Sequence, residues 1–495
     1  MMDQEYSPNR SLPDLPEEVV YSGVPLISSL IAILFKVSSL GVVRFLVLLL
    51  FVSSLLLVIR RIRTDWRYGK LAGLIVASGF LGWYALPAFI NFFSQGNPYR
   101  EILPVSIDHE ITIWAVIYLS LFLVTWVLAS HFFARFRFFR PAFPIVSFET
   151  NPLRLTWIGI ACCTASFIPY VFSGMGISEV ISLIFQGRLV EKPWLHWENL
   201  GDFRSPFLFV SHSAMAAGAC ILWLTTREKI FPLPRRILIG LFALIVSMVI
   251  FFDQGTRSTV ALVILPVLLM KCFEDWKRTK ARFLISASAF GVLFLVLLQL
   301  QLSFRVSGTS SGLPQLLLQK WVTLEDTTDM FSETVFSLKL VPSLHDYFRE
   351  SVLVHFLVSP IPRFIWPSKP ASQVVWYYTL HRWGIDIYEG GGNVFPGIVG
   401  HSYMSWGAWG PIFLGGFMGW LSSRVDGFLV RTSRISAPYY RAVGVMMSVW
   451  ILLSFRVISP GFLYPVVMVF VMVRLSSMER LDVHPRYMAP DKPAS

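Results

Sequence analysis

Long apolar segments, separated by shorter polar ones, recur from one end of this sequence to the other. Runs of roughly 17 to 23 apolar residues are long enough, as helices rising about 1.5 Å per residue, to cross a hydrocarbon core about 30 Å thick. The pattern therefore predicts an all-α, polytopic membrane protein. The predicted spans lie at about 24–40, 42–59, 71–93, 111–130, 153–172, 206–225, 237–252, 258–271, 283–302, 407–423, 442–457 and 461–474.

The start of this pattern allows two arrangements. Lys36 and Arg44 flank the short segment SSLGVV, so residues 24–59 form either a hairpin of two spans or one span beside an interfacial helix. The predicted number of transmembrane helices is accordingly 11 or 12. With twelve spans, both termini lie in the cytoplasm.

Composition supports a membrane protein, and the distribution of charge predicts its orientation. Of the 495 residues, 55% are hydrophobic and 15% are charged, and the mean hydropathy is +0.61. The net charge of +12 comes from basic residues in alternate short loops, which the positive-inside rule assigns to the cytoplasm. Topology explains this charge, so we expect no nucleic-acid partner. The basic loops lie at 60–70, 134–140, 226–236, 271–282 and 422–434.

Two segments on the outer side are too long to be simple turns. Residues 173–205 are rich in Trp, His, Arg and acidic residues, and residues 303–406 are long enough for a small domain. The amphipathic pattern at 313–338 predicts that this larger loop is partly helical. The predicted organisation is a tail (1–23), a bundle of about nine spans (24–302) that includes the loop 173–205, the large outer loop (303–406), C-terminal spans (407–474) and a tail (475–495).

An acid and an arginine lie four residues apart between two predicted spans, at Asp253 and Arg257. An arginine at a membrane surface is costly unless it is paired or hydrated. Two interpretations stay open: Arg257 pairs with Asp253 at the interface, or it binds an anion. Four further outer arginines favour an anionic lipid head group such as pyrophosphate, because guanidinium binds phosphate oxygens in pairs. They are Arg188, Arg305, Arg363 and Arg456.

A second group of polar residues precedes the predicted span 407–423. The segment EGGGN begins at Glu389 and offers backbone N–H groups for an anion, but it lacks the lysine and preceding strand of a P-loop. His401, two residues before Tyr403, is either a general base toward a sugar hydroxyl or an interfacial histidine bonded to the backbone. The glycines that follow predict close helix packing. They are Gly407, Gly410, Gly415, Gly416 and Gly419.

Metal and cysteine chemistry have little support in the sequence. Cys162, Cys163 and Cys220 lie in apolar spans and Cys272 at a cytoplasmic edge, so neither an extramembrane disulfide nor a Cys/His metal site is predicted. Serine-hydrolase and zinc-protease motifs are also absent from the sequence. We therefore expect any group transfer to be independent of metal, with arginines neutralising the leaving group.

Three segments carry a family resemblance: DQGTRSTVALVILPVLL at a span entrance, PRFIWPSKP in the large outer loop, and GIVGHSYMSWGAWGPIFLGGFMG near the C-terminus. Together they resemble the oligosaccharide repeat unit polymerases, the Wzy-type O-antigen polymerases of bacterial inner membranes. The resemblance covers roughly residues 70–475 through topology, and 250–425 most strongly.

This resemblance implies a GT-C-like glycosyltransferase whose active face is periplasmic and which acts in lipopolysaccharide biosynthesis. Such enzymes transfer a growing glycan from undecaprenyl pyrophosphate to a newly flipped, lipid-linked repeat unit, and neither a metal nor another cofactor is expected. The implied partners are these lipid-linked glycans, membrane lipid, a chain-length regulator (Wzz-like) and a flippase. The predicted catalytic residues are His401, Arg257 and Asp253, and the predicted substrate-binding residues are Arg188, Arg305, Arg363, Arg456, Glu389 and Tyr403.

Two other functions fit part of the same pattern. An O-antigen ligase shares the lipid carrier, the long outer loop and the arginines. A flippase or transporter for lipid-linked oligosaccharides needs a charged cavity among the spans, whereas nearly all charges in this sequence lie at span ends. The sugars joined, the linkage formed and the oligomeric state are not predicted.

Overall fold

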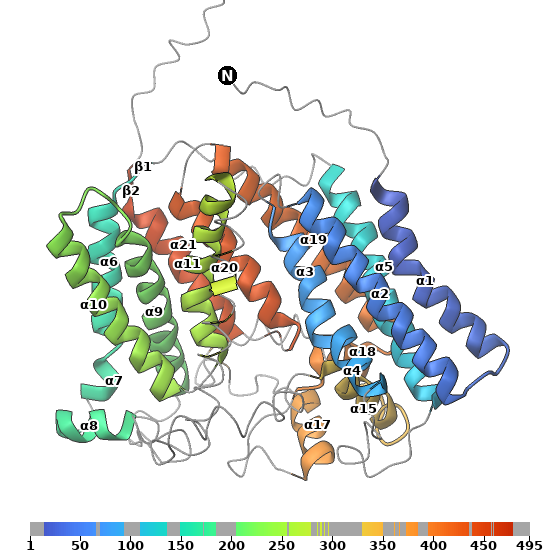
Figure 1. Cartoon of the computed structure of the whole chain (residues 1–495). Coiled ribbons are helices and arrows are strands. Elements are labelled where there is room, and N and C mark those ends of the chain that lie inside the picture. Colours follow the sequence, from blue (N-terminus) through green and yellow to red (C-terminus); the bar gives the residue numbers. More distant parts are fainter. Residues whose placement is uncertain are drawn as a thin grey trace, which may run out of the picture.

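A computed structural model of the chain is a bundle of helices (Figure 1). It describes residues 14–65, 70–93, 109–135, 149–171, 173–184, 204–254, 257–278, 285, 288–289, 292, 296, 329–349, 361, 366, 373–384, 395–434, 438–456, 458 and 460–478. Six helices in this part of the chain are long and apolar enough to cross a membrane. They are Glu17–Leu34, Leu40–Thr64, Ala72–Phe93, His109–Ala134, Pro152–Val171 and Leu233–Asp253.

These six helices confirm a helical membrane protein. Three shorter apolar helices, Val210–Thr225, Val260–Lys271 and Phe462–Ser476, lie where further spans are predicted. The total of 11 or 12 spans stays a prediction, because the predicted span 283–302 falls almost entirely outside the described residues.

The first two helices that the structure describes, α1 (Asp14–Leu34) and α2 (Leu40–Thr64), form an antiparallel hairpin. The side chain of Ser39 caps α2 by accepting a hydrogen bond from the backbone N–H of Val42 at 3.4 Å. Of the two arrangements that the sequence allows for 24–59, the structure has the hairpin.

The hairpin packs against two further parts of the chain: a segment of three consecutive short helices, and one long helix. The segment runs through α3 (Ala72–Phe80), the π-helix η2 (Leu81–Ala85) and α4 (Leu86–Phe93). The long helix α5 (His109–Arg135) lies against α1 and against α19 (Trp409–Arg434).

Glycines allow α5 and α19 to approach closely. A Cβ atom added at Gly415 would lie 2.4 Å from the carbonyl oxygen of Phe122, and one at Gly419 would lie 2.6 Å from that of Trp126. Gly416, between them, faces open space. The prediction of close packing is therefore confirmed at Gly415 and Gly419 and wrong at Gly416.

A second group of helices follows. It contains α6 (Pro152–Ala165), α7 (Ile168–Val171), α8 (Ile177–Ile184), α9 (Arg204–Thr225), α10 (Leu233–Val249), the π-helix η6 (Ile250–Gln254) and α11 (Arg257–Arg278). The C-terminal helices α20 (Pro438–Ser454) and α21 (Pro460–Ser476) join the two groups, because α20 packs on α3 and α11 while α21 packs on α9 and α6. The short strands β1 (Glu149–Thr150) and β2 (Ser477–Met478) pair antiparallel at one end of the bundle.

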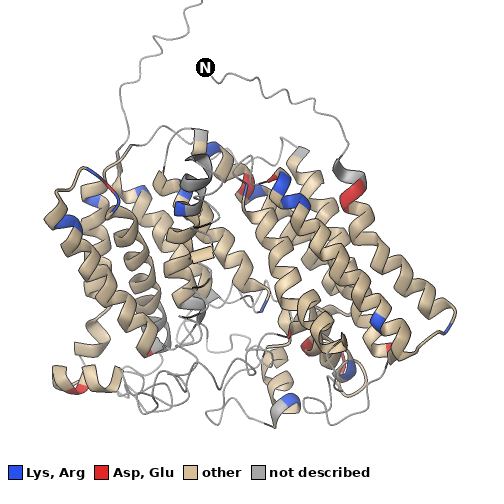
Figure 2. Cartoon of the chain, viewed as in Figure 1, with Lys and Arg blue, Asp and Glu red and all other residues tan. Residues whose placement is uncertain are grey.

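Basic residues gather mainly at that same end of the bundle (Figure 2). We call it the basic face; α2 and α21 end there, and α10 begins there. The last turns of α2 and α21 contribute Arg61, Arg63 and Arg474, and the first turn of α10 contributes Arg235 and Arg236. The other end, which we call the opposite face, carries α8, η6, α15 (Met330–Leu340) and α17 (Gln373–Trp383).

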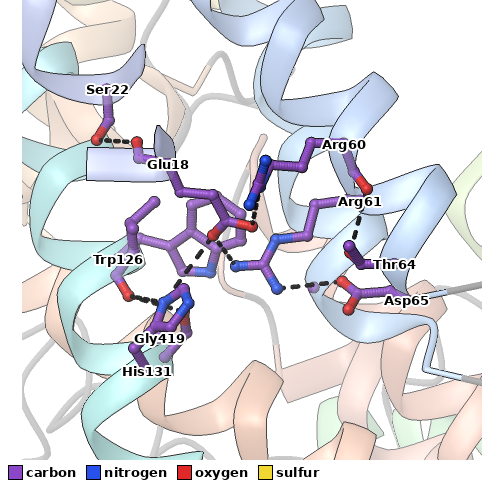
Figure 3. A network of polar contacts seen from close by, with 12 residues as sticks. Glu18, Ser22, Arg60, Arg61, Thr64, Asp65, Trp126, His131 and Gly419 are labelled. Carbon is purple, nitrogen blue, oxygen red and sulfur yellow. Dashed lines mark hydrogen bonds and ion pairs between the residues drawn. The ribbon is translucent and has the colours of Figure 1, made fainter. Parts of the chain in front are cut away.

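A buried ionic network at the basic face holds α1 and α2 together (Figure 3). Two nitrogens of the Arg61 guanidinium lie 2.6 Å from a carboxylate oxygen of Glu18 and 3.1 Å from one of Asp65. The guanidinium also lies over the ring of Trp126 on α5, with 5.2 Å to the centroid. Pairing a buried arginine in this way offsets its loss of hydration.

Beside this network, Asp426 of α19 caps the start of α3. Its carboxylate accepts hydrogen bonds from the backbone N–H groups of Leu71, Ala72 and Gly73 at 2.8, 2.7 and 3.0 Å. The residue at the N-cap position, Leu71, has no side chain that could do this. The first turn of α3 is therefore satisfied by a residue from a distant part of the chain.

Candidate functional site

The candidate site is a cluster of buried polar side chains at the opposite face, on α15 and α17. The sequence forms α15 because Asp329 caps it: one carboxylate oxygen of Asp329 accepts a hydrogen bond from the backbone N–H of Ser332 at 3.0 Å. Every residue of α15 except Lys339 is buried. Glu333, one turn after the cap, is thus a buried acid in a helix that the sequence places outside the spans.

Two side chains of α17 bind the carboxylate of Glu333. The hydroxyl of Tyr378 donates a hydrogen bond to Oε2 of Glu333, and Nε of Arg382 lies 3.4 Å from the same oxygen. The side chains of Glu333 and Arg382 are only 7% and 5% exposed, so this ion pair is largely shielded from water. The guanidinium of Arg382 lies 5.2 Å from the ring centroid of Phe336.

Burial dominates the protonation of Glu333. Loss of hydration raises the pKa of Glu333 above its ordinary value, and the positive charge of Arg382 and the hydrogen bond from Tyr378 oppose that increase. The negative charge of Asp329 raises the pKa further. A buried carboxyl with a raised pKa and a cationic partner is typical of a general acid or base.

Asp329 is the second buried carboxyl of α15. Its Oδ2 accepts a hydrogen bond from the Ser332 hydroxyl. The same oxygen accepts a second hydrogen bond from the side-chain amide nitrogen of Asn91 on α4, at 2.5 Å. Burial raises the pKa of Asp329, and these hydrogen bonds oppose the increase. We call Asp329, Glu333, Tyr378 and Arg382 the Glu333 cluster.

The predicted substrate-binding residue Arg456 lies near this cluster, between α20 and α21. It interacts electrostatically with Glu333, and its guanidinium lies 5.9 Å from the ring centroid of Phe395. Within the described residues, the buried Nε of Arg456 has no hydrogen-bond partner. Arg456 is thus a cation with an unused donor, and a guanidinium donor is the group that binds the oxygens of an anion.

Tyr84 holds the backbone beside Arg456 in place. Its hydroxyl donates to the carbonyl oxygen of Phe455 and accepts from the backbone N–H of Val399, both at 3.2 Å. The carbonyl of Phe455 also accepts from the backbone N–H of Ile398 at 3.1 Å. The residue before Arg456 is therefore bonded to the start of α18 (Gly397–Trp406).

The predicted residues His401 and Tyr403 lie on α18, which packs against α15. His401 is buried at 8% exposure. The hydroxyl of Tyr403 lies 3.4 Å from that of Tyr347, and its ring centroid lies 4.9 Å from that of Tyr118. Tyr403 therefore belongs to a group of three tyrosines rather than to the Glu333 cluster.

Asp253 lies in a separate polar group at the opposite face. It is buried in η6, which directly follows α10. Its Oδ2 accepts a hydrogen bond from the hydroxyl of Tyr170 at 2.6 Å and lies 4.0 Å from Nε2 of His212. Arg257 begins α11, and its side chain lies outside the described part of the structure.

Several predicted residues fall outside the described residues. They are Arg188, Arg305, Arg363 and Glu389. The structure thus places Arg456 where it interacts electrostatically with Glu333, and His401 on a helix that packs against α15. Asp253 instead lies with Tyr170.

The sequence prediction missed Asp329, Glu333, Tyr378 and Arg382. A local signal existed, because Asp329 and Glu333 are four residues apart and so are Tyr378 and Arg382. Such spacing places both members of a pair on one side of a helix. In the described part of the chain, no group of three or more His, Cys, Asp and Glu side chains is placed to hold a metal ion.

Comparisons with protein-family models, curated proteins and solved structures gave no match.

Proposed function

We propose that this chain is a membrane glycosyltransferase that polymerises oligosaccharide repeat units carried on undecaprenyl pyrophosphate. The product would be O-antigen or a related surface polysaccharide, made at the periplasmic face of a bacterial inner membrane. The helical membrane bundle and the segregation of basic residues to one face support this orientation. The resemblance of three sequence segments to repeat unit polymerases supports the reaction class.

The observation that carries the proposal is the buried Glu333 beside Arg382 and Arg456 at the face opposite the basic residues. Transfer of a glycan from a pyrophosphate requires a base for the attacking hydroxyl and positive charge for the leaving group. A carboxyl with a raised pKa supplies the base. A guanidinium with an unused donor supplies the charge.

The proposed step is one displacement. A hydroxyl of the incoming repeat unit attacks the anomeric carbon of the growing glycan, and the hydroxyl proton passes to Glu333. The bond between that carbon and the pyrophosphate oxygen breaks, and the bonding electrons leave with the pyrophosphate. Arg456, with the predicted contacts Arg257 and Arg363, would stabilise the charge that develops there.

His401 is the other candidate for the base. It lies on α18, which packs against α15, and histidine titrates near neutral pH. The two candidates are separable by substitution with glutamine, which keeps the size and polarity of glutamate and cannot accept a proton from the hydroxyl.

The test is the surface-polysaccharide ladder of a deletion strain complemented by variants, with membrane levels checked by immunoblot. We expect wild type and the control Glu179→Gln, an acid on α8 at the same face, to restore the ladder. Glu333→Gln should leave lipopolysaccharide with a single repeat. A full ladder from well-expressed Glu333→Gln would refute Glu333 as the base. If His401→Gln then fails to complement, the base would be His401.

The deletion itself tests the function. A polymerase deletion leaves core with one repeat, whereas loss of the alternative ligase leaves bare core while lipid-linked polymer accumulates. Loss of a flippase leaves no polymer at all. An unchanged ladder in the deletion strain would contradict polymerisation of O-antigen.

A further inference from the structure

α17 presents a second pair of side chains beside those that bind Glu333. Tyr377 directly precedes Tyr378, and His381 directly precedes Arg382. Successive residues of a helix are about 100° apart around its axis, so this second pair lies on a neighbouring side of α17. The rings of Tyr377 and His381 stack with their centroids 4.0 Å apart. One helix thus adjoins both the Glu333 cluster and an aromatic surface.

Two rings from the segment after α15 extend this surface. The ring of His345 lies 4.9 Å from that of Tyr377 and stacks on Phe348 at 4.2 Å, with 5° between the ring planes. Phe348 and Tyr377 are also in contact, with centroids 5.3 Å apart. We call His345, Phe348, Tyr377 and His381 the aromatic array.

The backbone that carries the array is held in place by α18. The N–H groups of Phe348 and Arg349 donate to the carbonyl oxygens of Met404 and Ser405 at 3.1 and 2.9 Å. Gly407, at a φ of +59°, lets the chain turn where a Cβ atom would lie 3.0 Å from the ring of Tyr347. The array is therefore preformed on a fixed support.

The edges of the array offer hydrogen-bonding groups. Nδ1 of His345 lies 2.5 Å from the carbonyl oxygen of Asp346, and Nδ1 of His381 lies 3.0 Å from that of Tyr377. A carbonyl only accepts, so in each neutral ring Nδ1 carries the proton and Nε2 is an acceptor. Both histidines are exposed, Phe348 is half-buried and Tyr377 is buried, so the histidine rings form the accessible part of the array. Within the described residues, neither histidine Nε2 has a hydrogen-bond partner.

We propose that the aromatic array binds sugar rings of the glycan, at a subsite beside the Glu333 cluster. This inference rests on the proposed function, because it assigns a place to the substrate of that reaction. The C–H face of a sugar ring packs on aromatic faces, while its hydroxyls donate to the two imidazole Nε2 atoms; this combination of apolar faces and a few placed polar groups is typical of ligand sites. A glycan on the array would therefore be bound on the same helix whose Tyr378 and Arg382 contact Glu333.

The direct test measures binding to the full-length protein in lipid nanodiscs. The probe is the polysaccharide released by mild acid from the parent strain, which has no lipid and no pyrophosphate, and the readout is its dissociation constant by calorimetry. We expect the double variant His345→Gln, His381→Gln to bind about tenfold more weakly, since it loses two rings. The neighbouring control Leu344→Ala, exposed but outside the array, should bind like wild type.

A second double variant separates stacking from hydrogen bonding. His345→Phe with His381→Phe keeps the rings and removes both Nε2 acceptors, so we expect a loss of about threefold, smaller than for glutamine. Wild-type affinity in the glutamine variant would overturn the proposal. An equal loss in both double variants would overturn the stacking contribution.

The length distribution of the polymer distinguishes failure of the aromatic-array proposal from failure of the proposed polymerase function. If the array retains the growing chain, the glutamine variant should still join two repeats but should give a ladder with a shorter modal length. A normal length distribution from that variant, in a strain whose deletion collapses the ladder, would overturn the array and leave the polymerase intact. An intact ladder in the deletion strain would instead overturn the polymerase.

Discussion

Tyr378 donates a hydrogen bond to the carboxylate of Glu333 across the contact between α17 and α15. Arg382, one helical turn later, approaches the same carboxylate oxygen at 3.4 Å. The acid is therefore buried between a hydroxyl that favours its charged form and a cation that does the same. Both oppose the effect of burial, so the protonation of Glu333 is adjustable by substitution on α17.

Arg382→Gln should shift the pH dependence of activity. Glu333 acts as a base only when ionised, so the rate should rise with pH through the pKa of Glu333. Arg382 lowers the pKa of Glu333, so its removal should move the rising, acidic limb of the pH–rate profile to higher pH. Arg382→Lys keeps the charge and should keep the limb near its wild-type position. The measurement is the initial rate against pH in proteoliposomes with lipid-linked repeat unit; an unmoved limb in Arg382→Gln would show that Glu333 is not the titrating base.

Arg456→Gln should lower the rate of transfer by about 10²- to 10³-fold, because a leaving-group contact is lost. Arg456→Lys keeps the charge without the two-pronged geometry and should be intermediate. Arg349→Gln is the matched control, since Arg349 is an exposed arginine at the same face. Polymer yield and membrane level are measured together, and normal polymer from Arg456→Gln would remove Arg456 from the site.

Arg257→Ala should abolish polymer although the protein still inserts and accumulates. Arg257→Lys should also be impaired, because it loses bidentate binding. Arg63→Ala, an exposed arginine in the last turn of α2 at the basic face, serves as control. The ladder is again the readout, and full-length polymer from Arg257→Ala would contradict its predicted role.

The spans were predictable because their signal is local. The length and apolarity of Leu40–Thr64 or His109–Ala134 are evident in any window of the sequence. The Glu333 cluster was not predictable in this way, because its residues come from two separate helices. Each helix contributes a pair of residues four positions apart, and Glu333 of the first pair lies 45 residues before Tyr378 of the second. Each pair marks one side of its own helix, and only tertiary packing brings the two sides together.

Asp253 also has a partner that the sequence did not indicate. Its neighbour in sequence, Arg257, is the predicted ion-pair partner, because residues four apart on a helix are close, and this pairing stays a prediction, since the side chain of Arg257 lies outside the described part of the structure. The structure adds a hydrogen bond from Tyr170, which lies 83 residues earlier in the chain. The π-helix η6 that holds Asp253 is an irregular turn that apolar periodicity does not predict.

Asp426→Ala should destabilise the protein by about 2 kcal/mol or more, because three backbone N–H groups of α3 lose their acceptor in a buried place. Asp426→Asn keeps one acceptor oxygen and should cost less. Thermal unfolding of the purified variants in detergent measures the difference. Equal unfolding temperatures for wild type and Asp426→Ala would show that the cap contributes nothing.

Gly419→Ala should destabilise the contact between α5 and α19 by about 1 to 3 kcal/mol, since its Cβ atom would lie 2.6 Å from the carbonyl oxygen of Trp126. Gly416→Ala is the matched control on the same helix, where a Cβ atom meets open space. Alanine favours a helix over glycine, so the control should be neutral or stabilising by up to about 1 kcal/mol. The same unfolding assay applies, and a similar loss in both variants would contradict a steric cause.

The cap that Asp426 provides to α3 also has a consequence for biogenesis. Leu71 leaves the ribosome 355 residues before Asp426 does, which at about 5 to 20 residues per second is a delay of roughly 20 to 70 seconds. During that interval, the first turn of α3 is without the carboxylate that satisfies it in the finished protein. The N-terminal half of the bundle therefore reaches its final form only after α19 has been synthesised and inserted, so a chain truncated before α19 should leave α3 accessible to proteases or quality control at its basic-face end.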